Sequence, residues 1–191
     1  HVLETGYLGN DLELLQTIDD YALRDAAAQI MAILDGEDVA GKMADEVRAQ
    51  MSTLNEVLAG TTSSDEKEKI LMGLISAEGV RAWPCDFGTC MFRPETALCH
   101  FAGKGYYDAS GRRPLASERC VDLCCGCSNL LVSARHLSYW KARYRLNYEL
   151  KIAYRDAGET AWGLLAARRA KVAAVILKSH GLTDLEIANA A

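Results

Sequence analysis

The stretch CVDLCCGC at residues 120–127 places four cysteines within eight residues. Three more cysteines precede it, at positions 85, 90 and 99, so that all seven lie within 43 residues and the other 148 residues hold none. Such a density calls for a chemical explanation. Disulfide bonding, redox catalysis and metal binding are the three chemistries that compete for it.

Around this cluster, the composition is that of an ordinary globular protein. The 191 residues are 50% hydrophobic and 25% charged, which suffices for one domain of usual size or two small ones. There is no run of about 18 apolar residues and no signal-peptide pattern, so we expect no membrane partner and a cytoplasmic location. The first residue is His1 rather than Met, which is compatible with a piece of a larger protein.

Apolar residues at helical spacing predict helices on both sides of the cluster. The expected helices cover residues 10–35, 38–58, 64–77, 133–157 and 159–181, with a short final helix from 183 onward. Ser63 with Glu66, and Thr183 with Glu186, have the spacing of a capping box at the start of two of them.

The segment between the two sets of helices lacks this periodicity and holds all three prolines. We expect a loop-rich insert, at most with short hairpins, that has too few large aliphatic residues to fold without a cross-link. The predicted fold is therefore mainly α, a helical assembly with an irregular cysteine-rich insert. Its parts are an N-terminal helical part (1–78), the insert of metal-binding type (79–131) and a C-terminal helical part (132–191), which pack together in one compact unit.

Metal binding explains the cysteines best, because zinc takes four Cys or His ligands and can hold together a segment that lacks its own core. Disulfides are disfavoured by the odd count, by the absence of an export signal and by the adjacency of Cys124 and Cys125. The Cys-x-x-Cys spacing at 124–127 lacks the strand–helix alternation of thioredoxin-like folds. An iron–sulfur cluster and simple burial of the cysteines stay open.

The insert offers seven cysteines for four places around a structural zinc ion. We expect the ligands to be Cys90, Cys99, Cys120 and Cys127, with Cys124 and Cys85 in reserve. His100 directly follows Cys99, which makes joint ligation of one ion awkward, and His136 is expected to pack beside the site rather than to bind. Four thiolates would leave no open position for water, so the site would be structural.

Charge is divided along the chain. Residues 1–80 carry 16 Asp and Glu against 5 Lys and Arg, whereas residues 132–180 carry 10 Lys and Arg against 3 Asp and Glu. One interpretation is that the two parts pack against each other or that their charged residues lie on solvated helix faces. The other is that the basic part contacts phosphate. For the second case we expect DNA contacts at Arg135, Lys141, Arg143, Arg145, Lys151 and Arg155, among interleaved aromatic residues that also suit a core.

Two other classes of function stay open. A structural module could self-associate through Leu146, Leu150, Trp162 and Ile176 without contacting nucleic acid. A thiol redox enzyme or metal hydrolase would need a reactive thiol of low pKa at Cys124 or Cys127. The sequence holds no Gly-rich phosphate loop and no His-Glu-x-x-His or Gly-x-Ser-x-Gly motif, so no catalytic residue is assigned.

Three phrases carry a family resemblance: FGTCMFRPETALCH (87–100), ERCVDLCCGCSN (118–129) and ARHLSYW (134–140). They resemble the cysteine-rich C-terminal region of integrase-like proteins, of the tyrosine-recombinase type, from bacterial mobile elements. The matching positions are Cys90, Phe92, Pro94, Glu95, Thr96, Ala97, Cys99, Cys127, Asn129 and His136, all within about residues 85–140.

The resemblance implies a larger polypeptide with a DNA-breaking core upstream, built on Arg, Lys, His and a nucleophilic Tyr. This chain does not supply the His-x-x-Arg step of such a core, because Tyr139 stands three residues after His136. What the resemblance implies for this chain is a non-catalytic accessory domain. Its cofactor would be a structural zinc, and its partners DNA, a second protomer or other recombination proteins.

Overall fold

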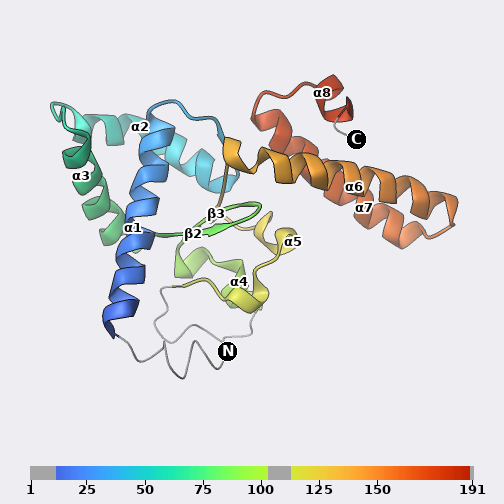
Figure 1. Ribbon diagram of the computed structural model, residues 1–191, viewed down its shortest axis with the longest axis horizontal. Helices are drawn as coiled ribbons and strands as arrows, with labels where there is room; N and C mark the ends of the chain where they lie inside the picture. The colour runs from blue at the N-terminus through green and yellow to red at the C-terminus, as the bar shows by residue number, and fades with distance from the viewer. Residues whose placement is uncertain (1–11, 103–112, 190–191) are drawn as a thin grey trace.

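The computed structural model describes residues 12–102 and 113–189, and it shows a mainly helical chain around a small antiparallel sheet (Figure 1). The long helices are α1 (Leu12–Leu34), α2 (Lys42–Leu58), α3 (Ser64–Ala77), α6 (Leu137–Asp156) and α7 (Thr160–Ser179), followed by the short α8 (Asp184–Asn189). The expected helices are confirmed, with differences of a few residues at their ends.

Four short strands form the sheet, in the order β1–β4–β3–β2 with every neighbouring pair antiparallel. They are β1 (Val39–Ala40), β2 (Arg81–Cys85), β3 (Gly88–Phe92) and β4 (Leu130–Ser133), and the short helices α4 (Leu98–Ala102) and α5 (Val121–Cys124) lie between β3 and β4. The cysteine-rich segment thus supplies three of these strands. It is more regular than the sequence predicts, because strands buried on both faces show no alternation of apolar and polar residues.

Strand β4 is buried along its whole length and separates two hydrophobic clusters. Leu131 belongs to one cluster, whereas Leu130 and Val132 belong to the other, since successive side chains of a strand point to opposite faces. In β1, Val39 and Ala40 divide in the same way. The sheet is therefore covered by side chains on both faces.

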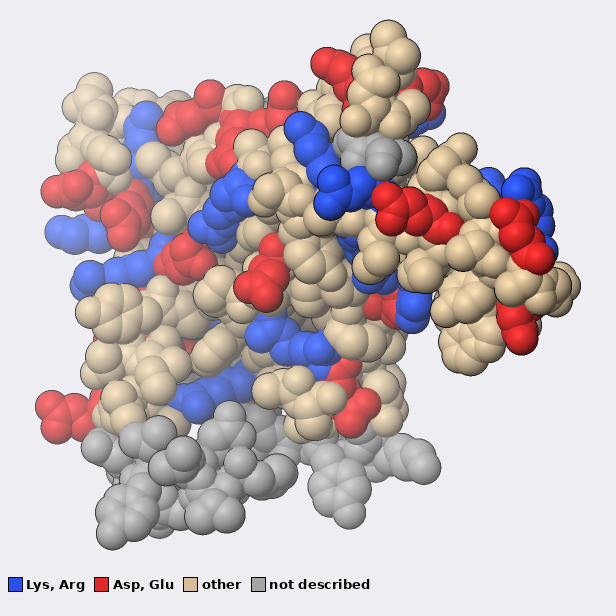
Figure 2. All heavy atoms as spheres, turned by 45° about the vertical axis from the view of Figure 1, so that its right-hand side comes forward, with Lys and Arg blue, Asp and Glu red and all other residues tan. Residues whose placement is uncertain are grey.

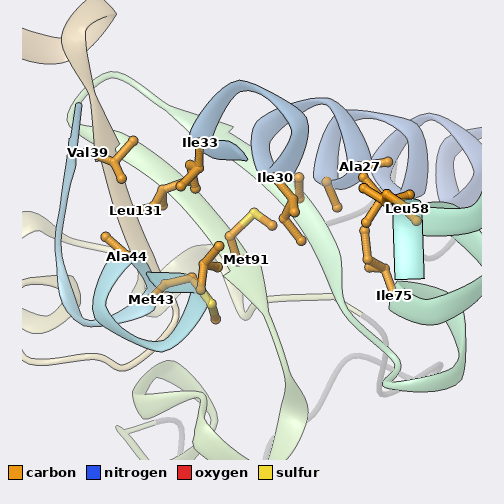
Figure 3. Packing of buried hydrophobic residues seen from close by; sticks show 14 residues of the cluster. Ala27, Ile30, Ile33, Val39, Met43, Ala44, Leu58, Ile75, Met91 and Leu131 are labelled. Carbon is orange, nitrogen blue, oxygen red and sulfur yellow. The ribbon is translucent and has the colours of Figure 1, made fainter. Parts of the chain in front are cut away.

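The first cluster joins α1, α2 and α3 to one face of the sheet (Figure 3). Ile30 and Ile33 of α1 and Met43 of α2 lie around Met91 of β3, whereas Ile75 of α3 lies near Leu58 of α2 (Figure 3). The apolar faces of α1 and α2 pack on the sheet, and that of α3 packs on α1.

The second cluster covers the opposite face with α6, α7 and α8. The indole N–H of the fully buried Trp140 donates a hydrogen bond to the carbonyl oxygen of Phe87 (2.9 Å), which ties α6 to the turn of the β2–β3 hairpin. The two helical parts thus lie on opposite sides of the sheet, and both pack on it. Beyond the sheet, α6 and α7 continue side by side as a helical hairpin (Figure 1).

Gly41 links β1 to α2 at a point where the chain passes very close to β4. Its φ is 96°, and a Cβ added there would overlap the carbonyl oxygen of Leu130 and lie 3.1 Å from the carbonyl carbon. Only glycine accommodates both the positive φ and the lack of room for a Cβ. A positive φ strains other residues, and β4 cannot move without disturbing both clusters.

We predict that Gly41→Ala lowers the free energy of unfolding by about 3 kcal/mol, because backbone strain and the overlap with Leu130 add together. Gly36→Ala is the matched control: Gly36 has the same φ of 96° with nothing within 4 Å of an added Cβ. Gly36→Ala should lower the free energy of unfolding by the backbone strain alone, about 1 kcal/mol. Urea denaturation of both variants measures the difference, and equal losses would contradict the close approach to β4.

Candidate metal centre and nucleic-acid interface

Four of the seven thiols gather where β3, α4 and α5 meet. Cys90 stands on β3, Cys99 on α4, Cys124 at the end of α5 and Cys127 three residues later. Burial raises the pKa of Cys90; the positive charge of Arg119 opposes this, and the thiols of Cys127, Cys124 and Cys99 raise it further. These four thiols are therefore close enough to influence one another's ionisation, and we call them the thiol cluster.

Cys124 and Cys127 are held on a tight turn that follows α5. The Cys127 N–H donates to the carbonyl oxygen of Cys124 (3.0 Å), and the Gly126 N–H to that of Leu123 (3.1 Å). The Cys127 thiol in turn donates to the carbonyl oxygen of Thr96 (3.6 Å). The turn thus presents two thiols three residues apart to the segment that leads into α4.

The buried side chain of Asn129 binds the two cysteine-bearing segments together. Its Nδ2 donates to the carbonyl oxygen of Arg93 (3.0 Å), and its Oδ1 accepts a hydrogen bond from the Thr96 hydroxyl (2.6 Å). Arg93 precedes the short 3-10 helix η2 (Pro94–Thr96), and Thr96 is its last residue. Asn129 and the Pro-Glu-Thr phrase, two parts of the family resemblance, are therefore in direct contact.

The other three cysteines lie at the margin of the thiol cluster or outside it. Cys120 is exposed at the start of α5, and it influences the pKa of Cys125 rather than that of Cys90. Cys85 donates from its thiol to the carbonyl oxygen of Gly88 (2.9 Å) in the β2–β3 turn, and it influences the pKa of Cys124. Of the expected ligand set, the structure brings Cys90, Cys99 and Cys127 together, and it places Cys124 beside them rather than Cys120.

Within the described residues, which include all seven cysteines, no group of three or more His, Cys, Asp or Glu side chains is arranged to hold a metal ion. The zinc site therefore stays a prediction. The cysteines are all unpaired thiols. Burial raises the pKa of Cys124 to about 12 and that of Cys125 to about 11, whereas a nucleophilic thiol needs a lowered pKa, so these two thiols do not suit redox catalysis.

His136 caps the short 3-10 helix η4 (Ala134–His136), which leads directly into α6. Its Nδ1 accepts a hydrogen bond from the backbone N–H of Ser133 (3.2 Å), in the manner of a capping box, although the sequence lacks the usual Glu at that place. Burial, aided by the charge of Arg135, lowers the pKa of the imidazole, which keeps it neutral at pH 7. The position of this histidine in the family resemblance thus has a structural explanation at the helix start.

Arg143, one of the six residues expected to contact DNA, is engaged within the fold. It pairs with Asp122 of α5, and Arg169 of α7 pairs with the same carboxylate. Burial of Asp122 opposes its ionisation, but the hydrogen bond from Arg169 and the charge of Arg143 outweigh this and lower its pKa. Asp122 therefore connects α5 to both helices of the hairpin.

The remaining basic residues of α6 are on its solvent side. Lys141, Arg145 and Lys151 are exposed and form no ion pair with the described part of the chain, and Lys151 Nζ lies 5.6 Å from the ring centre of Tyr148. Of the aromatic residues expected among them, Trp140 is in the core. Figure 2 shows Lys and Arg side chains in the middle of one face of the molecule, with Asp and Glu between and around them.

Arg155 and Arg135 take other partners. Arg155 forms an exposed ion pair with the adjacent Asp156 (2.9 Å), and Arg135 donates to the hydroxyl of Thr89 on β3 (2.7 Å). Both guanidinium groups retain further N–H donors. Arg135 and Arg155 are the first and last of the six residues expected to contact DNA. Lys141, Arg145 and Lys151 lie between them in the sequence.

Helix α7 adds basic residues that the sequence analysis counted but did not assign to a site. Arg168, Lys171 and Lys178 are exposed at a spacing that aligns them along one side of α7, and this helix contains no Asp or Glu. The sequence carries this signal as a helical stripe of basic residues. The stripe is less conspicuous than that of α6, where aromatic residues accompany the charges.

In comparisons with known proteins, no family model, no curated protein and no solved structure matches this chain. In the part of the chain that the structure describes, no helix combines the length and apolar character that crossing a membrane would require.

We predict that Asn129→Ala lowers the free energy of unfolding by about 3 kcal/mol, because it leaves the Arg93 carbonyl and the Thr96 hydroxyl without these hydrogen bonds. Ser128→Ala, at the neighbouring half-buried position, should change stability by less than about 0.5 kcal/mol. Denaturant titration of both variants checks this. A loss below about 1 kcal/mol in Asn129→Ala would show that this amide does not hold the segments together.

Proposed function

We propose that this chain is a non-catalytic DNA-contact domain of an integrase-like protein, in which a zinc-bound cysteine segment supports a basic helical hairpin. The observation that best supports this proposal is the positive charge of the hairpin: residues 137–179 contain nine Lys and Arg against three Asp and Glu. Lys141, Arg145 and Lys151 extend from α6 into solvent and form no ion pair with the described residues. Such unpaired cations suit a phosphate backbone.

The thiol cluster supports the zinc part of the proposal. Cys90, Cys99, Cys124 and Cys127 would hold the ion, and four thiolates would make it a structural site that links β3, α4 and α5. Burial and the neighbouring thiols raise the pKa of Cys90 and that of Cys124. A bound cation would stabilise the ionised forms of these two thiols, and its binding would release protons.

The link from the thiol cluster to the hairpin runs through α5. Cys124 ends this helix, and Asp122 within it pairs with Arg143 of α6 and Arg169 of α7. If a metal ion fixed α5, Asp122 would therefore hold α6 and α7 in one orientation at Arg143 and Arg169. Fixing that orientation in advance lowers the entropy cost of DNA binding.

We predict about one zinc ion per chain in protein purified without chelator. Cys124→Ser should lose most of this zinc, whereas Cys120→Ser, four residues away and exposed, should retain it. Metal analysis by mass spectrometry, with circular dichroism as a check on folding, measures both. Retention of zinc by Cys124→Ser together with its loss from Cys120→Ser would restore the ligand set expected from the sequence and contradict the one proposed from the structure.

We predict salt-dependent binding of duplex DNA, measured by fluorescence anisotropy at low ionic strength. Lys141→Glu with Arg145→Glu should weaken it by at least about tenfold, since two phosphate contacts are lost and repulsion replaces them. Lys67→Glu with Lys69→Glu on α3 changes the net charge equally, far from the hairpin in sequence, and should leave binding nearly unchanged. Equal weakening by both pairs would mean that only net charge matters.

A second candidate function is self-association through the hairpin. Leu146, Trp162 and Leu164 are large apolar residues at 55%, 56% and 67% exposure. Of the residues expected at such an interface, Leu146 and Trp162 are exposed and Leu150 is half-buried, but Ile176 is only 7% exposed in the second cluster and is not accessible to a partner. Sedimentation equilibrium tests this function: a mass that rises with concentration and falls in Trp162→Ser would favour it.

A further inference from the structure

A cavity of about 410 Å³ opens between the start of α2, the turn after α5 and the side of α7. Its cationic lining comes from two helices far apart in the sequence: Lys42 and Arg48 from α2, Arg168 and Lys171 from α7. Cys127 and Leu130 also line it, so the cavity borders the thiol cluster. We call it the α2–α7 groove.

The cations of the groove differ in how far the fold already uses them. Arg48 pairs with Asp45 (3.0 Å), and Lys42 Nζ donates one hydrogen bond to the carbonyl oxygen of Gly126 (2.8 Å). Arg168 and Lys171 are exposed and form no ion pair with the described residues. The lining includes one carboxylate, that of Asp45, and its charge is balanced by Arg48. The groove therefore has unsatisfied positive charge from α7 and from Lys42.

Most of the remaining lining is apolar. It includes Leu130 at the start of β4 and Val172, Val175 and Ile176 of α7, which follow the lining cations of that helix in sequence. Apolar walls keep the local dielectric constant low and strengthen the attraction of an anion to the neighbouring cations. No side chain caps the start of α2 at Gly41, so the positive end of that helix also faces this region.

We propose that the α2–α7 groove binds a phosphodiester of the DNA backbone, as a contact separate from the α6 residues Lys141 and Arg145. This rests on the proposed function, which it deepens by naming a second contact surface. Arg168 and Lys171 would pair with the phosphate oxygens from one wall and Lys42 from the other, while the valines contact the sugar. The unpaired cations and the apolar side chains beside them suit a phosphate and its sugar.

The test is DNA binding by Arg168→Gln with Lys171→Gln, measured by anisotropy over a range of salt concentrations. The proposal predicts about tenfold weaker binding at low salt and a slope of log K against log salt that is smaller by about 2. Lys67→Gln with Lys69→Gln on α3 is the matched control and should keep the slope of the unmodified chain. Zinc content and circular dichroism confirm that the variants are folded.

A second pair of variants tests the groove without removing its cations. Val175 is 55% exposed, so either charge is tolerated there. Val175→Glu should weaken DNA binding and Val175→Lys should strengthen it, each by a few-fold. Opposite effects from one position are not explained by a loss of folding.

The outcomes separate this inference from the proposed function. If the unmodified chain binds DNA and the Arg168 and Lys171 variant binds equally with the same slope, the groove proposal is overturned and the DNA-contact domain stands. If the unmodified chain does not bind DNA at low salt, both are overturned. If the groove variants change only the self-association measured by sedimentation, the groove belongs to a contact between protomers and the proposal is wrong.

Discussion

The hydrogen bonds of the buried Asn129 amide are the contacts on which the middle of this molecule depends. They join the Arg93–Thr96 segment to the residues that follow the cysteine turn, and the next residue, Leu130, begins β4. Strand β4 separates the two hydrophobic clusters, so one side chain links the thiol cluster to the packing of both helical parts. The cysteine-rich segment is thus the centre of the fold rather than an appendage.

Several contacts fix the orientation of the basic hairpin relative to β4. His136 accepts a hydrogen bond from Ser133 at the start of α6, and Trp140 binds the carbonyl oxygen of Phe87 one turn later. Asp122 then holds Arg143 and Arg169 together. The positions of the exposed cations on α6 and α7 therefore depend on the cysteine-rich segment, and the zinc ion that we propose there would help to fix them.

The long helices could be predicted from the sequence because each has one apolar face and a glycine or a capping residue near its end. The strands could not, because β3 and β4 are short and buried on both faces, so their apolar residues do not alternate with polar ones. Seven closely spaced cysteines also do not reveal which four meet: that depends on how α5 turns, which brings Cys124 toward Cys90 and leaves Cys120 in solvent. Likewise, only the packing shows that Arg143 pairs with Asp122 and that Ile176 is in the core.

We propose that a zinc ion held by the cysteine segment sets the geometry of a hairpin that contacts DNA. Titration of zinc into the metal-free chain, with duplex DNA binding followed by anisotropy, tests both parts at once. The account predicts that DNA affinity rises with added zinc and stops rising at about one ion per chain. DNA affinity that is the same with and without zinc, in a chain that stays folded throughout, would contradict it.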